Sequence, residues 1–132
     1  MNGDYTALVV DADAARRCHT VQTLFRMGYK VLYAESGAWA ITIGERYRDT
    51  VHLMIAAVGI ADMSGRQLAV KLQATRPGMK VLYISDHTTD ERSEHTGDDT
   101  GLVLRPPFTP QRMSAYISEL QTLSDLRVDY AR

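Results

Sequence analysis

Two aspartates follow the first apolar run of the chain, and their carboxylates are the side chains best suited to metal chemistry. Asp11 and Asp13 come directly after the run that ends at Val10, and Ser85 ends a second apolar run. Carboxylates are the hard oxygen ligands that Mg²⁺ requires, but two of them without a third oxygen-donating side chain make a poor cage. The simpler interpretation is that one aspartate caps the following helix and that Ser85 is a hydrogen-bonded residue at the end of a strand.

A third apolar run ends with no reactive side chain. The stretch from Leu53 to Gly65 reads LMIAAVGIADMSG, a pattern that predicts a buried strand, a loop and the start of a helix. The end of such a strand usually carries a reactive group, yet Ala57 stands there. The nearest carboxylates, Asp49 and Asp62, are too far along the chain for a one-residue shift to bring either to this place.

Three other residue types are candidates for chemistry or binding. The histidines lie on different predicted elements without a shared spacing, which favours solvated or capping roles: His19, His52, His87 and His95. Cys18 is the only cysteine, so it forms no internal disulfide, and we expect it to be a core residue on the inner face of the first helix. Trp39 is predicted to be partly exposed, either as an interface anchor or at the edge of the core.

Length and composition point to one ordinary globular domain. The chain has 132 residues and a formal net charge of −1, which gives no broad attraction to nucleic acid or to an anionic membrane. No apolar run is long enough to span a bilayer, and the N-terminus lacks the basic region of a secretory signal. We therefore expect a cytoplasmic protein.

The apolar runs alternate with segments of helical period, and this rhythm predicts an α/β fold. Five strands are expected at 5–10, 30–34, 52–58, 80–85 and 101–105, and helices at 14–27, 38–47, after Ser64, and from Thr109 to about Leu126. On the first helix, Cys18, Val21, Leu24 and Phe25 form the predicted inner face. Alternating units of this kind imply a parallel sheet with helices on both faces.

One segment breaks the rhythm. Residues 86–100 read DHTTDERSEHTGDDT and contain no hydrophobic residue, so a helix there would have no apolar face to pack against the sheet. We therefore expect a weak or missing fourth helix, with at most one or two turns near residues 90–95.

Four motifs in order make the chain resemble a response-regulator receiver domain. They are LVVDAD after the first strand, ADMSG after the third, LYIS at the fourth and LRPPFTP after the fifth. The last is similar to receivers attached to hybrid histidine kinases. The resemblance covers nearly the whole chain and implies one receiver-like domain over residues 1–132. It also implies a (βα)5 doubly wound five-stranded parallel sheet of the flavodoxin/CheY-like type, with strand order 2-1-3-4-5.

In that family an aspartate after the third strand accepts a phosphoryl group, assisted by Mg²⁺, a hydroxyl and a lysine. The resemblance places Asp11 at the first acidic position and Ser85 at the hydroxyl position. It places Ala12, Ala57 and Pro106 at the second acidic, phosphoacceptor and lysine positions. The chain therefore looks like a degenerate receiver that is not an enzyme, has no catalytic residues and needs no cofactor. Mg²⁺ binding is expected to be weak or absent, with Asp11 and Asp13 as the only weak candidate ligands.

These residues predict a pseudo-receiver that acts without phosphorylation, as a protein-interaction or regulatory module in bacterial two-component signalling. One alternative is a receiver that accepts phosphate on Asp11, Asp13 or Ser85; another is a small-ligand-binding α/β module. The expected partner is a histidine kinase, another receiver or an output domain, and a homodimer is a further alternative. Because the fourth helix is expected to be weak, binding is predicted through the first helix, the second helix near Trp39, or the last helix.

Overall fold

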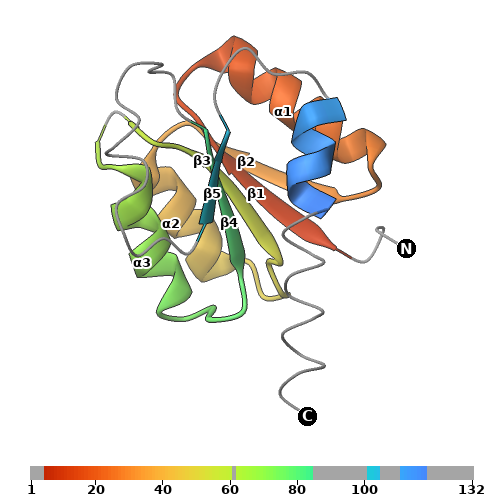
Figure 1. Cartoon of the computed structure of the whole chain (residues 1–132). Helices are drawn as coiled ribbons and strands as arrows, with labels where there is room; N and C mark the ends of the chain where they lie inside the picture. Colours follow the sequence, from red (N-terminus) through yellow and green to blue (C-terminus); the bar gives the residue numbers. More distant parts are fainter. Residues whose placement is uncertain (1–4, 61, 85–100, 105–110, 119–132) are drawn as a thin grey trace.

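The computed structural model of the chain contains a five-stranded sheet in which every pair of neighbouring strands is parallel (Figure 1). It describes residues 5–60, 62–84, 101–104 and 111–118. The strand order β2-β1-β3-β4-β5 confirms the predicted topology. The elements are β1 (Thr6–Val10), α1 (Ala14–Arg26), β2 (Lys30–Ala34), α2 (Gly37–Arg46), β3 (Leu53–Ala57), α3 (Gly65–Gln73), β4 (Lys80–Ile84) and β5 (Gly101–Leu104), followed by a helical stretch at 111–118.

Helices cover both faces of the sheet. Figure 1 shows α1 and the helical stretch at 111–118 on one face, with α2 and α3 on the other. Successive residues of β1 supply the two cores in turn: Leu8 and Val10 pack on the side of α2 and α3, whereas Ala7 and Val9 pack on the side of α1. This alternation follows from the two-residue period of a strand, and it explains why the strand is apolar at every position.

Two serines begin helices, as the sequence predicts. The Ser36 hydroxyl accepts a hydrogen bond from the backbone N–H of Trp39 at the start of α2. Ser64 does the same for Gln67 at the start of α3, and the Gln67 side chain accepts from the Ser64 N–H to complete a capping box. After α1, Gly28 has a φ of 94°, a left-handed conformation that favours glycine after a helix end.

The buried face of α1 differs from the prediction. Leu24 is fully buried, but Cys18 is exposed and Phe25 is 72% exposed, so the expectation that both face the core is wrong. Thr20 and Thr23 are buried instead. Their hydroxyls donate to the carbonyls of Arg16 and His19, each 2.9 Å away, so burial leaves neither hydroxyl unpaired. A pattern search that counts only apolar residues misses such a face.

Some predictions fall outside the described residues. They are the weak fourth helix in 86–100, the hydroxyl position Ser85, the lysine position Pro106, and both ends of the last helix. Within the described part of the chain, none of the helices is long and apolar enough to cross a membrane.

Candidate functional site at the carboxyl ends of the strands

The sheet brings the ends of β1 and β3 together. The two strands are neighbours, with Val10 paired to Ala56, so that Asp11 follows one strand beside Ala57 at the end of the other. The backbone N–H of Asp11 continues the ladder by donating to the Ala34 carbonyl, 3.1 Å away. The connection after β1 leads to the α1 face and the connection after β3 leads to the opposite face, so this edge is the switch point of the fold, where α/β proteins place their sites.

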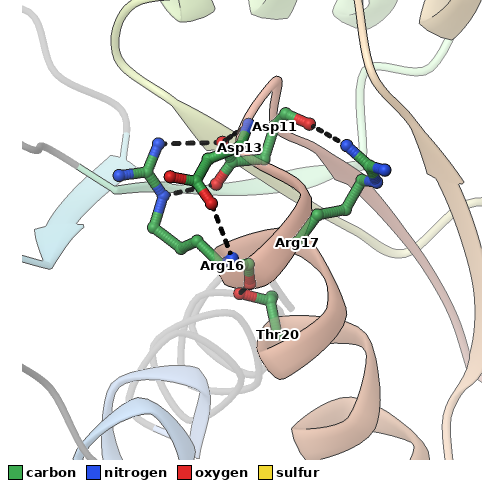
Figure 2. Close-up of polar contacts among 5 residues, drawn as sticks. All are labelled: Asp11, Asp13, Arg16, Arg17 and Thr20. Carbon is green, nitrogen blue, oxygen red and sulfur yellow. Dashed lines mark hydrogen bonds and ion pairs between the residues drawn. The ribbon is translucent and has the colours of Figure 1, made fainter.

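Asp11 is buried and its carboxylate is held by an arginine. The side chain of Arg16 turns back from the first turn of α1, and its Nε lies 2.6 Å from one carboxylate oxygen while Nη2 lies 2.8 Å from the other (Figure 2). The N–H of Asp13 donates to the same carboxylate at 2.9 Å. Asp11 is only 1% exposed, so this charge is almost wholly removed from water and is compensated by the guanidinium.

Asp13 is the N-cap of α1. Its carboxylate accepts a hydrogen bond from the backbone N–H of Arg16, 3.0 Å away. This hydrogen bond is the main reason that the pKa of Asp13 is lowered from its ordinary value, with the nearby positive charge of Arg16 also lowering it. The capping interpretation of Asp13 is therefore confirmed. Arg17 also turns toward this corner, but it donates to the Asp11 backbone carbonyl at 2.8 Å (Figure 2).

The end of β3 is closed by a tight loop. Ala57 is 2% exposed, and the residues after it pair with the start of α3: Gly59 bridges Ser64, and the Gly65 N–H donates to the Val58 carbonyl at 2.8 Å. A methyl group on Gly65 would lie 2.4 Å from the Ala57 carbonyl oxygen. The close approach of helix and strand requires glycine at position 65.

Asp62 in the same loop has a role that sequence reasoning missed. Its two carboxylate oxygens accept hydrogen bonds from the backbone N–H groups of Gly37 and Ala38, both at 2.9 Å, at the start of α2. These two bonds are the main cause of the lowered pKa of Asp62. The loop after β3 is thus fastened to α2. No local signal reveals this, because the partners are 24 and 25 residues apart in the chain.

Trp39 lies on an exposed side of α2. It is 55% exposed, and beside it is a surface depression of about 440 Å³ lined by Trp39, Thr42, Ile43, Arg46 and Tyr47. This placement agrees with the predicted partial exposure.

The described histidines do not join the site. His52 lies near the amino end of β3, where its Nδ1 accepts from the Thr6 N–H at 3.0 Å and its ring stacks on Tyr5 with centroids 4.7 Å apart. His19 lies on α1, while His87 and His95 are outside the described residues.

The donor set around Asp11 does not fit a divalent cation. Ala12 and Ala57 offer no side-chain oxygen, the Asp13 carboxylate caps α1, and both Asp11 oxygens already accept from Arg16. Among residues 5–60, 62–84, 101–104 and 111–118, no group of three or more His, Cys, Asp or Glu could hold a metal ion. A hard cation would have to displace the guanidinium before it met the Asp11 carboxylate.

Comparisons with known proteins agree with this fold. The sensor kinase CckA of Brucella abortus (strain 2308) is 27% identical over 126 residues, which cover 95% of this chain but only 13% of the kinase. The crystal structure of a response regulator receiver protein from Sinorhizobium medicae WSM419 matches with a TM-score of 0.79 at 25% identity, covering 91% of this chain and 96% of that one. No family model matches the chain.

The chain has the fold of response regulator receiver domains and resembles them in sequence. The sequence match to the sensor kinase CckA is joined by a match in fold: the crystal structure of a receiver domain from the hybrid histidine kinase CckA aligns with a TM-score of 0.71 at 24% identity, over 87% of this chain and 97% of that one.

Proposed function

We propose that this receiver works without phosphorylation, as a regulatory module that binds another signalling protein. The observation that carries the proposal is Ala57 at the carboxyl end of β3, where the resemblance expects the phosphoacceptor. A methyl side chain has no lone pair with which to attack phosphorus. Its neighbour in the sheet, Asp11, is already neutralised by Arg16, so no free carboxylate of these two strand ends faces the switch point.

The alternative acceptors Asp11 and Asp13 are disfavoured by their contacts. Attack on phosphorus needs a carboxylate oxygen with a free lone pair and an open approach. Asp11 is buried and accepts three hydrogen bonds, from Arg16 Nε, Arg16 Nη2 and the Asp13 N–H. Asp13 is exposed, but its carboxylate caps α1 with a lowered pKa, and phosphorylation would remove that cap. Ser85, the third alternative, lies outside the described residues.

Incubation with Mg²⁺ and acetyl phosphate, followed by intact mass measurement, tests the proposal. The positive control is the variant Ala12→Asp/Arg16→Gln/Ala57→Asp/Pro106→Lys, which supplies the three residues that the resemblance expects and the chain lacks, and which frees the Asp11 carboxylate from Arg16. We expect no mass change in the natural chain under conditions that phosphorylate the control. A gain of one phosphoryl group that hydroxylamine removes would contradict the proposal, and peptide mapping would then distinguish Asp11 from Asp13.

A partner of this module would be a histidine kinase, another receiver or an output domain. The similarity to the sensor kinase CckA supports a partner of this class. We place the contact at the outer side of α2, because Trp39 is 55% exposed there beside a surface depression. Aromatic side chains of this kind often anchor interfaces.

Substitution of Trp39 provides the test of this surface. With the kinase or receiver encoded beside this chain as the probe, Trp39→Ala should weaken binding by about tenfold or more, the effect typical of an interface anchor. The matched control is Val70→Ala on α3, which removes another apolar side chain that is 70% exposed. Equal weakening by both variants, or by neither, would place the contact elsewhere.

A further inference from the structure

We propose that Arg16 takes the place of the divalent cation at this site, as a positive charge tethered to α1 that closes Asp11 to metal. The inference concerns the cation site and does not depend on whether the chain is phosphorylated. It rests on the arrangement of Asp11, Arg16 and the first turn of α1 shown in Figure 2.

The guanidinium contacts both oxygens of the carboxylate. Nε lies 2.6 Å from Oδ2 and Nη2 lies 2.8 Å from Oδ1, which is the two-point geometry that arginine forms with carboxylates. A third donor, the Asp13 N–H, lies 2.9 Å from Oδ1. Three of the roughly four acceptor positions of the carboxylate are therefore used by the chain itself.

Burial makes some cation necessary here. The Asp11 side chain is only 2% exposed, and a carboxylate removed from water in this way is stable only when a positive charge and hydrogen bonds compensate it. A bound metal supplies that charge in other proteins, and here Arg16 supplies it. The Arg16 side chain is 19% exposed, so it is only partly open to solvent.

Arg16 is also held in position by its own backbone. Its N–H donates to the capping carboxylate of Asp13 at 3.0 Å, and its carbonyl accepts from the buried hydroxyl of Thr20 at 2.9 Å. The start of α1 therefore fixes the base of the side chain while the guanidinium reaches back to Asp11. The fixed backbone keeps the guanidinium within reach of the carboxylate, while the side chain still gives up rotamer freedom when it pairs.

The neighbouring arginine does not share this role. Arg17 donates to the backbone carbonyl of Asp11, so its charge does not contact the carboxylate. The proposal thus makes a specific claim: adding carboxylates at positions 12 and 57 is not sufficient to create a metal site, because Arg16 still occupies Asp11.

The test measures Mg²⁺ binding by titration calorimetry at constant ionic strength in three variants. The parent is Ala12→Asp/Ala57→Asp, the test variant adds Arg16→Gln, and the control adds Arg26→Gln, which removes the same charge from the last turn of the same helix. We expect the test variant to bind Mg²⁺ about tenfold or more tightly than the other two, because a unit charge within about 4 Å of the ion opposes binding even in a well-screened site. Equal affinity in all three variants would overturn the proposal.

A second measurement reads metal binding through stability. The thermal midpoint of Ala12→Asp/Ala57→Asp should be the same in MgCl₂ and in NaCl of equal ionic strength, whereas that of the triple variant, which adds Arg16→Gln, should be higher in MgCl₂. If the triple variant is unfolded without metal, recovery of its circular dichroism signal on adding Mg²⁺ supports the proposal. The absence of any Mg²⁺ effect on the triple variant, or an equal effect on the double variant, contradicts it.

Discussion

The Asp62 carboxylate accepts a hydrogen bond from the backbone N–H of Gly37, 2.9 Å away, and so joins the loop after β3 to the first turn of α2. The second oxygen accepts from the next N–H, that of Ala38. The start of a helix leaves several N–H groups without partners inside the helix, and here a distant loop satisfies two of them. This loop follows Ala57, so the Asp62 hydrogen bonds connect the candidate site to the start of α2.

This contact should make stability depend on pH. The hydrogen bonds lower the pKa of Asp62 in the folded chain. The stabilisation by the charged carboxylate is therefore complete above the unfolded pKa of about 3.9, and it is lost as the pH falls through the lower pKa of the folded chain. Asp62→Asn should therefore lower the urea midpoint at pH 7, and the difference from the natural chain should shrink below pH 4. The control is Asp49→Asn, which changes an exposed carboxylate that makes neither of these contacts. An Asp62→Asn penalty that stays constant down to pH 2 would show that the charge is unimportant.

Glycine is required at position 65 but not at position 59. A methyl group on Gly65 would lie 2.4 Å from the backbone oxygen of Ala57, whereas one on Gly59 would have no atom within 4 Å. Gly65→Ala should lower the free energy of unfolding by about 3 kcal/mol, the upper end for overpacking, because a backbone oxygen cannot move aside as a side chain can. Gly59→Ala should be nearly neutral.

Gly37→Ala provides an intermediate case. Its methyl group would meet the Met63 side chain at 2.6 Å, and a flexible methionine can adopt another rotamer. We expect a cost of about 1 kcal/mol. In urea unfolding, the loss of stability should be largest for Gly65→Ala, intermediate for Gly37→Ala and smallest for Gly59→Ala. A Gly65→Ala variant as stable as Gly59→Ala would mean that α3 can move away from β3.

Removal of Arg16 should destabilise the fold more than removal of Arg17. Arg16→Ala leaves the buried Asp11 without its cation, and we expect a loss of roughly 2–3 kcal/mol, less than for a wholly buried pair because the guanidinium is partly exposed. Arg17→Ala removes one hydrogen bond to a carbonyl and should cost about 1 kcal/mol. Chemical denaturation of both variants at pH 7 measures the difference. An equal loss would show that the Asp11 charge needs no specific partner.

Tyr29 should ionise only at a pH well above the ordinary pKa of a tyrosine. Burial, together with the proximity of the Tyr5 ring, raises its pKa from 10.0 to about 12. The phenol is neutral when protonated, so its contribution to stability is complete below pH 10 and is lost as the pH rises toward about 12. The difference in absorbance at high pH between the natural chain and Tyr29→Phe should therefore appear only near pH 12. A difference that appears near pH 10 would mean that this ring is open to water.

Local sequence patterns predict most of the fold. The apolar runs at Leu53 and Lys80 are strands, Ser36 and Ser64 begin helices, and Gly28 ends one, because each of these signals acts within a few residues. The five-stranded order was predicted from the resemblance, and the strand pairing confirms it. On the inner face of α1, the prediction of Leu24 is confirmed, whereas Cys18 and Phe25 are exposed and Thr20 and Thr23 are buried instead. The two hydroxyls tolerate burial because each donates to a carbonyl of the same helix, a compensation that apolar periodicity does not reveal.

The sequence by itself determined which groups the site lacks. The side chains of Ala12 and Ala57 are methyl groups, so neither offers an oxygen in any fold. Only the tertiary structure decided what the remaining groups do. Asp11 binds Arg16 because the chain turns between β1 and α1 and brings the helix's first turn back over the strand end. Asp62 binds α2 because two connections meet at the same edge of the sheet. The Asp11–Arg16 pair spans only five residues and depends on the turn between β1 and α1, whereas the Asp62 contacts span 25 and 24 residues and depend on the packing of the whole domain.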